Sequence, residues 1–246
     1  MHSVLTIAGS DSSGRAGIQA DLRTLAMLDV HGATAVTAIT AQNARGVIAI
    51  HALPADLVTA QIEAAAADGV HATKIGMLAN AAIVEAVAAA IEELDLPLVV
   101  LDPVLASTSG TRLLDADGVQ TLLLELLPRV LVVTPNLPEA EALSGLRIAS
   151  SADARRAAQR IHEMGAAHVV IKGGHAAGPR VTDVLFDGRT VHELTQERVS
   201  GPTMRGTGCS YASALAVFLA RGNPLVQAAE RAQQHVAGRI RSYTET

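Results

Sequence analysis

Short apolar runs rich in β-branched residues alternate with longer segments of helical periodicity along the chain. The apolar runs predict strands at residues 4–8, 34–39, 73–76, 98–102, 130–134, 168–172, 181–186 and 191–194. The helical segments are residues 17–28, 56–67, 81–94, 116–127, 138–144, 152–164, 208–220 and 224–242. Strands that are apolar throughout are typical of a sheet covered on both faces. The alternation therefore predicts an α/β fold of three layers, with a mostly parallel central sheet and helices on both faces.

Local signals at the ends of these segments agree with the assignment. Ser151 is the predicted N-cap of the helix that follows it, and Pro138 suits the first turn of another helix. The turn Asp187-Gly188 joins two apolar runs that we expect to pair as a hairpin. No linker, charge block or repeat divides the sequence, so we expect a single domain over residues 1–246.

The composition narrows the class of protein. The chain has 246 residues, of which 49% are hydrophobic and 17% charged, and this excludes an intrinsically disordered protein. Aromatic residues make up only 2%, and the formal net charge is -5. Base stacking and attraction to a phosphate backbone are both weak in such a chain, so we expect no nucleic-acid partner.

The cysteine count and the apolar runs bear on the compartment. Cys209 is the single cysteine and cannot form an internal disulfide, which indicates a reducing environment. No Lys or Arg precedes the first apolar run, and no apolar run reaches the roughly 18 residues of a membrane span. We therefore expect a cytoplasmic protein without a membrane partner.

Polar residues and glycines follow five of the predicted strands. These strand ends are residues 9–11, 74–76, 102–103, 134–136 and 172–175. Ligands of parallel sheets bind outside the carboxyl ends of the strands, so we expect a site built from several loops. Two of the ends carry Lys74 and Lys172, the only lysines among 19 basic residues. A lysine supplies a compact charge on a flexible stem, so we expect both to be functional.

The loop at residues 9–17 lies between a predicted strand and a predicted helix. It lacks the G-x-G-x-x-G spacing of dinucleotide sites, which argues against an NAD-dependent oxidoreductase. It matches a phosphate-binding P-loop only in part, because Arg15 replaces the required lysine and Ala16 has no hydroxyl for magnesium. The loop is either a flexible turn before a helix or a segment that closes over a small substrate.

A second glycine-rich segment, Gly206-Thr207-Gly208-Cys209, opens a predicted helix. The two glycines let successive backbone N–H groups face one point, and the helix N-terminus adds its dipole, which predicts an anion site. Fixed dipoles of this kind stabilise a phosphoryl group in transfer. The same field is expected to lower the pKa of Cys209. The alternative for Cys209 is a small buried hydrophobic residue.

Asp102, Asn136 and Glu139 are the candidate oxygen ligands. Asp102 directly follows an apolar strand, where an unpaired carboxylate would be costly. Mg²⁺ usually takes one or two carboxylates together with water and substrate phosphates, so Asp102 and Glu139 are the predicted metal residues. The alternatives are a turn role for Asp102 and a helix-capping role for Glu139.

At these positions the chain resembles the ribokinase-like small-molecule kinases, and most closely the hydroxymethylpyrimidine/phosphomethylpyrimidine kinases of thiamine synthesis. The matching segments run in order over nearly the whole chain. They are residues 5–14, 16–22, 40–43, 74–78, 101–104, 134–140, 172–175 and 206–209. The Gly-Thr-Gly-Cys segment alone would mark only the superfamily, whereas Gln-Asn, Lys-Ile-Gly-Met-Leu and Gly-Gly-His together favour the pyrimidine branch.

The resemblance implies phosphorylation of 4-amino-5-hydroxymethyl-2-methylpyrimidine at its hydroxymethyl oxygen by ATP, with Mg²⁺, and in the family a second transfer that makes the diphosphate. It implies that Cys209 is the base and that Gly206, Thr207 and Gly208 form the anion hole. The expected pyrimidine contacts are Gly9, Asp21, Gln42 and Met77. The expected nucleotide contacts are Asn136, Lys172 and Thr207, with Asp102 and Glu139 around magnesium.

Three positions depart from the family pattern. Arg15 stands where the family usually has Gly, Arg205 where it often has His, and Thr108 near a position that is often Lys. The two added guanidiniums are candidate contacts for the phosphate of a phosphorylated substrate. They could equally fill that space and confine the enzyme to the first phosphorylation.

Two other functions remain open at this stage. A pyridoxal or pyridoxine kinase has the same scaffold and the same Gly-Thr-Gly-Cys loop. A non-catalytic pyrimidine-binding sensor would belong to a different class, although the set of Asp102, Glu139, Lys172 and Cys209 argues against it. The resemblance also suggests a homodimer.

Overall fold

The computed structural model describes residues 2–175, 178–201 and 204–244, and within them the strands form one nine-stranded sheet. The strands are β1 (Ser3–Asp11), β2 (His31–Asn43), β3 (Gly46–Ala52), β4 (Ala72–Ile75), β5 (Val99–Leu101), β6 (Val132–Val133), β7 (His168–Ile171), β8 (Arg180–Phe186) and β9 (Val191–Glu197). Their spatial order is β3-β2-β1-β4-β5-β6-β7-β8-β9. Strands β2, β1, β4, β5, β6 and β7 are parallel, whereas β3, β8 and β9 each pair antiparallel to their neighbours.

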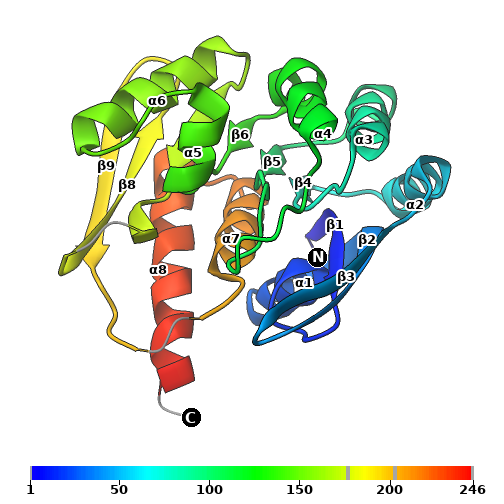
Figure 1. Cartoon of the computed structure of the whole chain (residues 1–246), viewed down its shortest axis with the longest axis horizontal. Helices are drawn as coiled ribbons and strands as arrows, with labels where there is room; N and C mark the ends of the chain where they lie inside the picture. Colours follow the sequence, from blue (N-terminus) through cyan, green and yellow to red (C-terminus); the bar gives the residue numbers. More distant parts are fainter. Residues whose placement is uncertain (1, 176–177, 202–203, 245–246) are drawn as a thin grey trace.

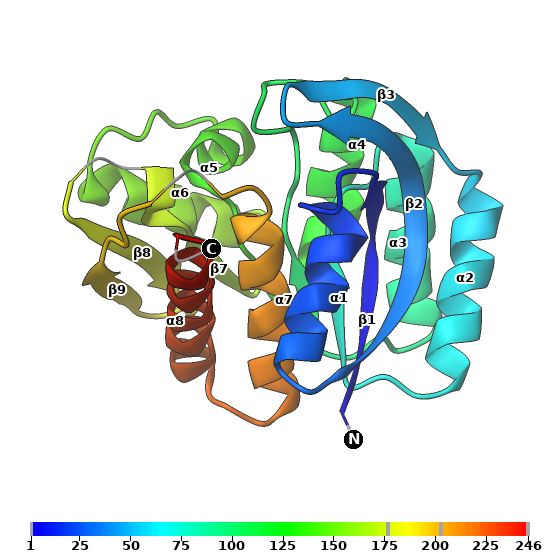
Figure 2. The same ribbon diagram turned by 90° about the horizontal axis from the view of Figure 1, so that it is seen from below.

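Helices cover both faces of the sheet, so the expected three-layer α/β fold is confirmed (Figure 1). The helices are α1 (Gly17–Met27), α2 (Ala55–Ala67), α3 (Ala81–Glu93), α4 (Ala116–Thr121), α5 (Leu137–Ser144), α6 (Ser151–Glu163), α7 (Thr207–Ala220) and α8 (Leu225–Thr244). Helices α1, α7 and α8 lie side by side on one face, as Figure 2 shows, and α2 to α6 lie on the other.

Two apolar cores follow from these layers. One joins the sheet to α2 through α6, and the other joins it to α7 and α8. Helix α7 is apolar on nearly all sides because it lies between the sheet and α8, and its residues from Ser210 to Leu219 are all buried. The N-terminus of this rigid central helix is thereby fixed at the carboxyl edge of the parallel strands.

Three details differ from the sequence-based expectations. Strand β3 was not predicted, because its outer face is exposed and its alternation is weak. The predicted helix at 116–127 is α-helical only to Thr121, continues as a π-helix and ends as a 3-10 turn that contains Pro128, which cannot continue an α-helix. The N-cap of α6 is Ser150 and not Ser151, since the Ser150 side chain accepts the N–H of Asp153.

Other local expectations are confirmed. The β8–β9 hairpin forms around Gly188, whose φ is 89°. The Asp187 side chain accepts the N–H groups of Arg189 and Thr190 and so closes the turn. Pro138 lies in the first turn of α5, as predicted. No described helix is both long and apolar enough to cross a membrane.

Candidate active site

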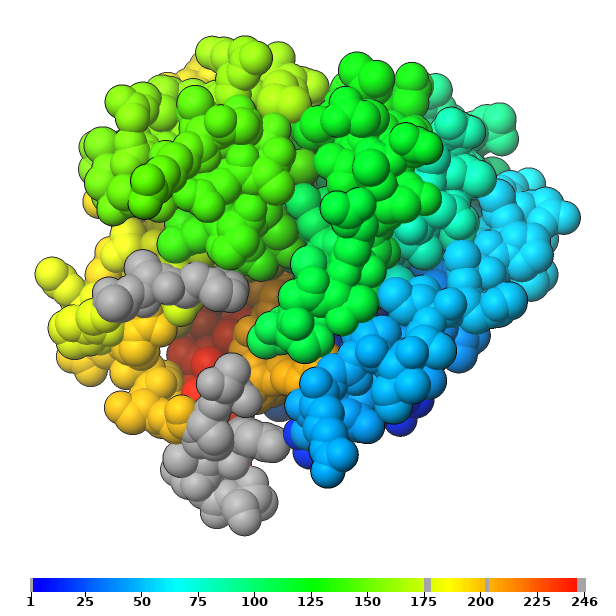
Figure 3. Space-filling view, in the orientation of Figure 1, coloured from blue at the N-terminus to red at the C-terminus, as the bar shows by residue number. Residues whose placement is uncertain are grey.

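A cavity of about 1050 Å³ opens at the carboxyl ends of the parallel strands. Figure 3 shows the hollow between the β2–β3 edge, the segment that precedes α4 and the β8–β9 side, with α7 and α8 at its floor. Most of the predicted site residues line it. They are Gly9, Gln42, Met77, Asp102, Asn136, Glu139, Lys172, Arg205, Gly206, Thr207, Gly208 and Cys209. The two predicted residues that do not line it are Asp21 and Arg15.

The start of α7 shapes the middle of the cavity. Gly206 is the N-cap with a φ of 77°, and a Cβ there would lie 2.2 Å from the carbonyl oxygen of Arg15. A Cβ on Gly208 would lie 3.1 Å from Lys172 Nζ. Only glycine fits at position 206. At position 208 the missing side chain keeps the end of the helix open to the cavity. The first N–H groups of a helix have no intrahelical acceptor, so this end offers free donors to an anion.

Cys209 lies in this first turn and is partly exposed to the cavity. The N–H of Gly17 donates to its sulfur. Burial raises the pKa of the thiol to about 11, opposed by the charge of Lys74 and reinforced by Asp21 and Asp102. The expected lowering of this pKa is therefore wrong for the ligand-free protein, because desolvation of the thiolate outweighs the attraction of nearby positive charge.

Lys172, Asp102 and Glu139 form a charged group opposite the start of α7. Lys172 Nζ lies 2.7 Å from Asp102 Oδ1. Burial lowers the pKa of Lys172, but the charges of Asp102 and Glu139 outweigh it, so the net shift is upward. Burial raises the pKa of Glu139 to about 7, with Lys172 opposing and Asp102 adding to the shift. At neutral pH the ligand-free site therefore holds Glu139 partly protonated.

Glu139 and Asn136 also cap helix α5. Asn136 N donates to Glu139 Oε2 at 2.8 Å, and Glu139 N donates to Asn136 Oδ1 at 2.9 Å, a reciprocal capping box. The capping alternative for Glu139 is thus present. It uses one carboxylate oxygen, which leaves the other available, so capping and ligand binding are compatible.

The donor set fits a hard divalent cation held in part by phosphate. Among the described residues, no group of three or more His, Cys, Asp or Glu side chains could hold a metal ion by itself. Asp102 and Glu139 provide two carboxylates in one cavity. Proteins usually bind Mg²⁺ through one or two carboxylates, and phosphate and water complete its coordination shell.

Asp21 lies behind the cavity wall. Its Oδ2 accepts Lys74 Nζ at 2.8 Å and Thr6 Oγ1 at 2.7 Å, and its Oδ1 accepts Ser213 Oγ at 2.9 Å. The carboxylate is completely buried. A direct contact between Asp21 and a pyrimidine is therefore not supported, because its oxygens already bind three protein donors and none faces the cavity.

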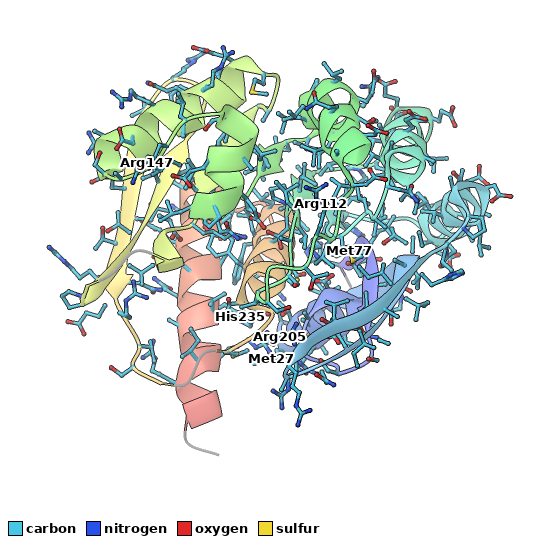
Figure 4. The ribbon with its side chains drawn as sticks, in the orientation of Figure 1. Met27, Met77, Arg112, Arg147, Arg205 and His235 are labelled. Carbon is cyan, nitrogen blue, oxygen red and sulfur yellow. The ribbon has the colours of Figure 1, made fainter. Side chains whose placement is uncertain are left out.

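The two arginines that depart from the family pattern behave differently. The Arg15 side chain is exposed outside the cavity, while its backbone carbonyl packs against Gly206. Arg205 does line the cavity and donates to Gln42 Oε1 at 2.9 Å and to the carbonyl oxygen of Asn43 at 2.6 Å. Figure 4 labels Arg205 and Met77, which enter the site from distant parts of the sequence. In this structure Arg205, and not Arg15, is placed to contact a phosphate in the cavity.

The end of the cavity between β8, β9 and α8 was missed by the sequence analysis. Its lining residues include Asp183, Tyr211, Gln233, Val236 and Ala237. Asp183 accepts Gly173 N at 2.7 Å and Gln233 Nε2 at 3.0 Å, and burial raises its pKa to about 6. The available signal was a carboxylate inside the apolar run at 181–186, where an unpaired charge would be costly.

The sheet order, the glycine-rich helix entry and the neighbouring lysine–carboxylate group define an α/β small-molecule kinase of the ribokinase-like class. A model of the phosphomethylpyrimidine kinase family matches residues 11–246. The chain belongs to this family.

Relatives with an assigned name are consistent with this family membership. The hydroxymethylpyrimidine/phosphomethylpyrimidine kinase of Bacillus subtilis is 44% identical over 238 residues, which cover 96% of this chain and 88% of the relative. The thiamine biosynthesis bifunctional protein of Geobacter sulfurreducens is 44% identical over 240 residues. The match covers 97% of this chain, which spans about half (49%) of that longer protein.

Solved structures share the fold. Phosphomethylpyrimidine kinase from Clostridium difficile 630 has a TM-score of 0.86 at 34% identity, covering 98% of this chain and 100% of that chain. Pyridoxal kinase from Staphylococcus aureus in complex with ADP has a TM-score of 0.90 at 37% identity, covering 98% of this chain and 88% of that chain.

Proposed function

We propose that this protein phosphorylates the hydroxymethyl oxygen of 4-amino-5-hydroxymethyl-2-methylpyrimidine with ATP, a step of thiamine biosynthesis. The observation that carries the proposal is one cavity that joins the open start of α7, Cys209 and the Lys172–Asp102–Glu139 group. Its volume of about 1050 Å³ is enough for a small alcohol and a nucleotide together. Family membership supports the same reaction.

The two ends of the cavity suit the two substrates. Gly9, Met77 and Gln42 lie at the end near β1, β2 and β4. A Cβ on Gly9 would lie 2.9 Å from Met77 Sδ, so glycine keeps a flat space beside the thioether for a ring. Gln42 is expected to bind the polar edge of the pyrimidine. Asn136, Lys172 and Thr207 are the proposed contacts of the ATP phosphates, with the nucleoside toward the β8–α8 end.

Cys209 is the proposed proton acceptor. Its thiolate takes the proton of the hydroxymethyl group, and the oxygen electron pair attacks the terminal phosphorus of ATP. The bond from that phosphorus to the bridging oxygen breaks, and ADP leaves with the electron pair. The free N–H groups at the start of α7 stabilise the moving phosphoryl charge. With a pKa of about 11, the thiol is almost entirely protonated at pH 7. Turnover limited by this step rises with pH through the alkaline range.

Asp102 and Glu139 are the proposed magnesium residues. When bound, the cation neutralises phosphate charge and orders the phosphate chain. Glu139 has to lose its proton to act as a ligand, so the cation binds more tightly as pH rises through about 7.

The direct test is product analysis by mass spectrometry after incubation of the pyrimidine alcohol with ATP and Mg²⁺. The expected products are ADP and a phosphorylated pyrimidine; no ADP above background at saturating alcohol would refute the substrate. Cys209→Ala is expected to lower kcat by about 100-fold or more with little change in KM. Near-normal turnover of this variant would remove the base role.

The same analysis tests the second phosphorylation. Arg205 lies in the cavity next to Gln42 and is the proposed bidentate contact for the phosphate of a monophosphate substrate. Diphosphate in the products of the unmodified enzyme is then expected. Arg205→Ala should reduce kcat/KM for the monophosphate more than for the alcohol, and an equal loss for both substrates would contradict the contact.

Pyridoxal phosphorylation is a second candidate activity, favoured by the likeness to pyridoxal kinase from Staphylococcus aureus. The values of kcat/KM for pyridoxal and for the pyrimidine alcohol, measured side by side, rank the two. Calorimetry that found tight pyrimidine binding without ATP turnover would instead support a sensor.

A homodimer is proposed through the β2–β3 edge of the sheet. Ile48 and Ile50 on β3 are 73% and 38% exposed, and Ile39 on β2, on the opposite face of the sheet, is 48% exposed. Large apolar side chains gathered at one sheet edge favour contact with a second copy.

A further inference from the structure

The lysines of this chain are confined to the cavity. The sequence has 19 lysines and arginines, and only Lys74 and Lys172 are lysines. Both line the cavity, and each is paired with an aspartate at 2.8 or 2.7 Å. Lys172 already has a proposed role toward phosphate. Lys74 has none, yet its side chain and that of its partner Asp21 are both fully buried.

A buried ion pair is costly, so stability alone does not explain why Lys74 and Asp21 occupy these positions. Taking two charges out of water is unfavourable, and a well-packed apolar pair of similar volume is often as stable. Asp21 is fixed by Thr6 Oγ1 at 2.7 Å and by Ser213 Oγ at 2.9 Å. Three donors on one carboxylate hold its charge, and therefore the ammonium group, in one position.

The pair adjoins the start of α7. Ser213, which binds Asp21, lies four residues after Cys209 on α7, and residues at this spacing share a helix face. Lys74 and Cys209 also line the same cavity. Lys74 therefore lies within electrostatic reach of the Cys209 sulfur, on the side of α7 where Ser213 binds its partner Asp21.

The space around Lys74 explains why it is not arginine. A Cβ on Gly76 would lie 2.7 Å from Lys74 Nζ, so the backbone that directly follows β4 lies close to the ammonium group. A planar guanidinium is bulkier than an ammonium group, so this close approach of the backbone favours lysine. The position takes a compact cation in a chain that otherwise uses arginine.

We propose that Lys74, held by Asp21, is a positioning residue that acts through Cys209 by keeping a fixed positive charge beside its sulfur. This inference rests on the proposed role of Cys209 as proton acceptor. Burial lowers the pKa of Lys74, but Asp21, Cys209 and Asp102 together outweigh it and raise this pKa, so the charge persists. Lys74 is the largest charge that opposes the upward shift of the Cys209 pKa, while Asp21 and Asp102 add to it. Lys172 and Arg239 also interact electrostatically with the sulfur.

The test uses the fact that Cys209 is the only cysteine. The rate of its alkylation by iodoacetamide, followed by intact mass in the ligand-free protein over a range of pH, reports the thiolate fraction. Lys74→Met removes the charge and keeps the length of the side chain. Lys74→Met combined with Asp21→Asn leaves no unpaired buried charge and decides the question if the single variant does not fold. Arg155→Met is the control, because it removes an exposed cation that pairs with Glu193.

Lys74→Met is expected to slow alkylation at least tenfold at a given pH, to move the rate profile to higher pH and to lower kcat with less than a twofold change in KM. The alkylation rate of the double variant should lie between that of the protein without substitutions and that of Lys74→Met. The alkylation rate of Arg155→Met should equal that of the protein without substitutions. If the Lys74 variants are alkylated at the same rate as the protein without substitutions, the proposal is overturned. A raised KM together with an unchanged alkylation rate would also overturn it. Alkylation needs no substrate, so this outcome is independent of whether the pyrimidine is phosphorylated.

Discussion

Burial sets the protonation of the two central acidic groups in the cavity. It raises the pKa of Cys209 to about 11 and that of Glu139 to about 7, each against the opposing charge of a lysine. Both groups are therefore largely or partly protonated before substrates bind. A ligand that brings positive charge, as a magnesium ion does, favours the ionised form of Glu139 and couples binding to proton release.

Glu139→Gln should change how stability depends on pH. The ordinary pKa of 4.5 applies to the unfolded chain and the value of about 7 to the folded one. The folded protein holds this proton more tightly, so the contribution of Glu139 is fully present below about pH 4.5 and is lost as pH rises to about 7. The loss amounts to roughly 3 kcal/mol at this shift. Urea denaturation of the ligand-free variant should lack this decline.

The control for this experiment is Glu63→Gln, which alters an exposed carboxylate of α2. It should keep the pH dependence of the unmodified protein. If Glu139→Gln also kept it, Glu139 would not hold a proton in the folded state at neutral pH.

At the scale of elements, both ends of α7 carry a glycine with positive φ, in different surroundings. Gly206 precedes the helix with a φ of 77°, and a Cβ there would meet Arg15 O at 2.2 Å. Gly222 follows it with a φ of 78°, and nothing lies within 4 Å. The backbone strain of a substitution is thus the same at the two positions, and only the collision differs.

Gly206→Ala and Gly222→Ala form a matched pair. Gly222→Ala is expected to cost about 1 kcal/mol of stability and to leave kinetics unchanged. Gly206→Ala should in addition move the 9–17 loop away from α7 and lower kcat/KM by about 100-fold, because phosphoryl transfer depends on donor placement. Steady-state kinetics and urea denaturation measure both. Equal effects of the two changes would contradict a positional role for Gly206.

At the scale of the whole molecule, the exposed apolar edge predicts the assembly. Ile48 is 73% exposed on β3, and Leu124 is 70% exposed after α4 on another part of the surface. Ile48→Glu should convert a dimer to a monomer, whereas Leu124→Glu should leave it intact. Sedimentation equilibrium over a range of protein concentrations distinguishes these outcomes. A monomeric unmodified protein, or dissociation by both changes, would exclude this edge as the interface.

The site could be predicted to the extent that its residues follow strands or open a helix. Lys172, Asp102 and Gly206–Cys209 all fall at such points, and they line the cavity. The burial of Asp21 behind the cavity wall could not be predicted, because its partners, Thr6, Lys74 and Ser213, are up to 192 residues away in sequence. Asp183 was missed because it lies within a strand and meets the cavity only where β8 packs near α8.

The sequence by itself determined most of the strands and helices in their order, the mostly parallel sheet and the loops that carry chemistry. These features depend on hydrophobic periodicity and on glycines within a few residues. Only the tertiary structure decided which lysine pairs with which aspartate and how far burial shifts each pKa. Those properties depend on the solvent and charges around a side chain, which come from segments distant in sequence, and no local pattern encodes them.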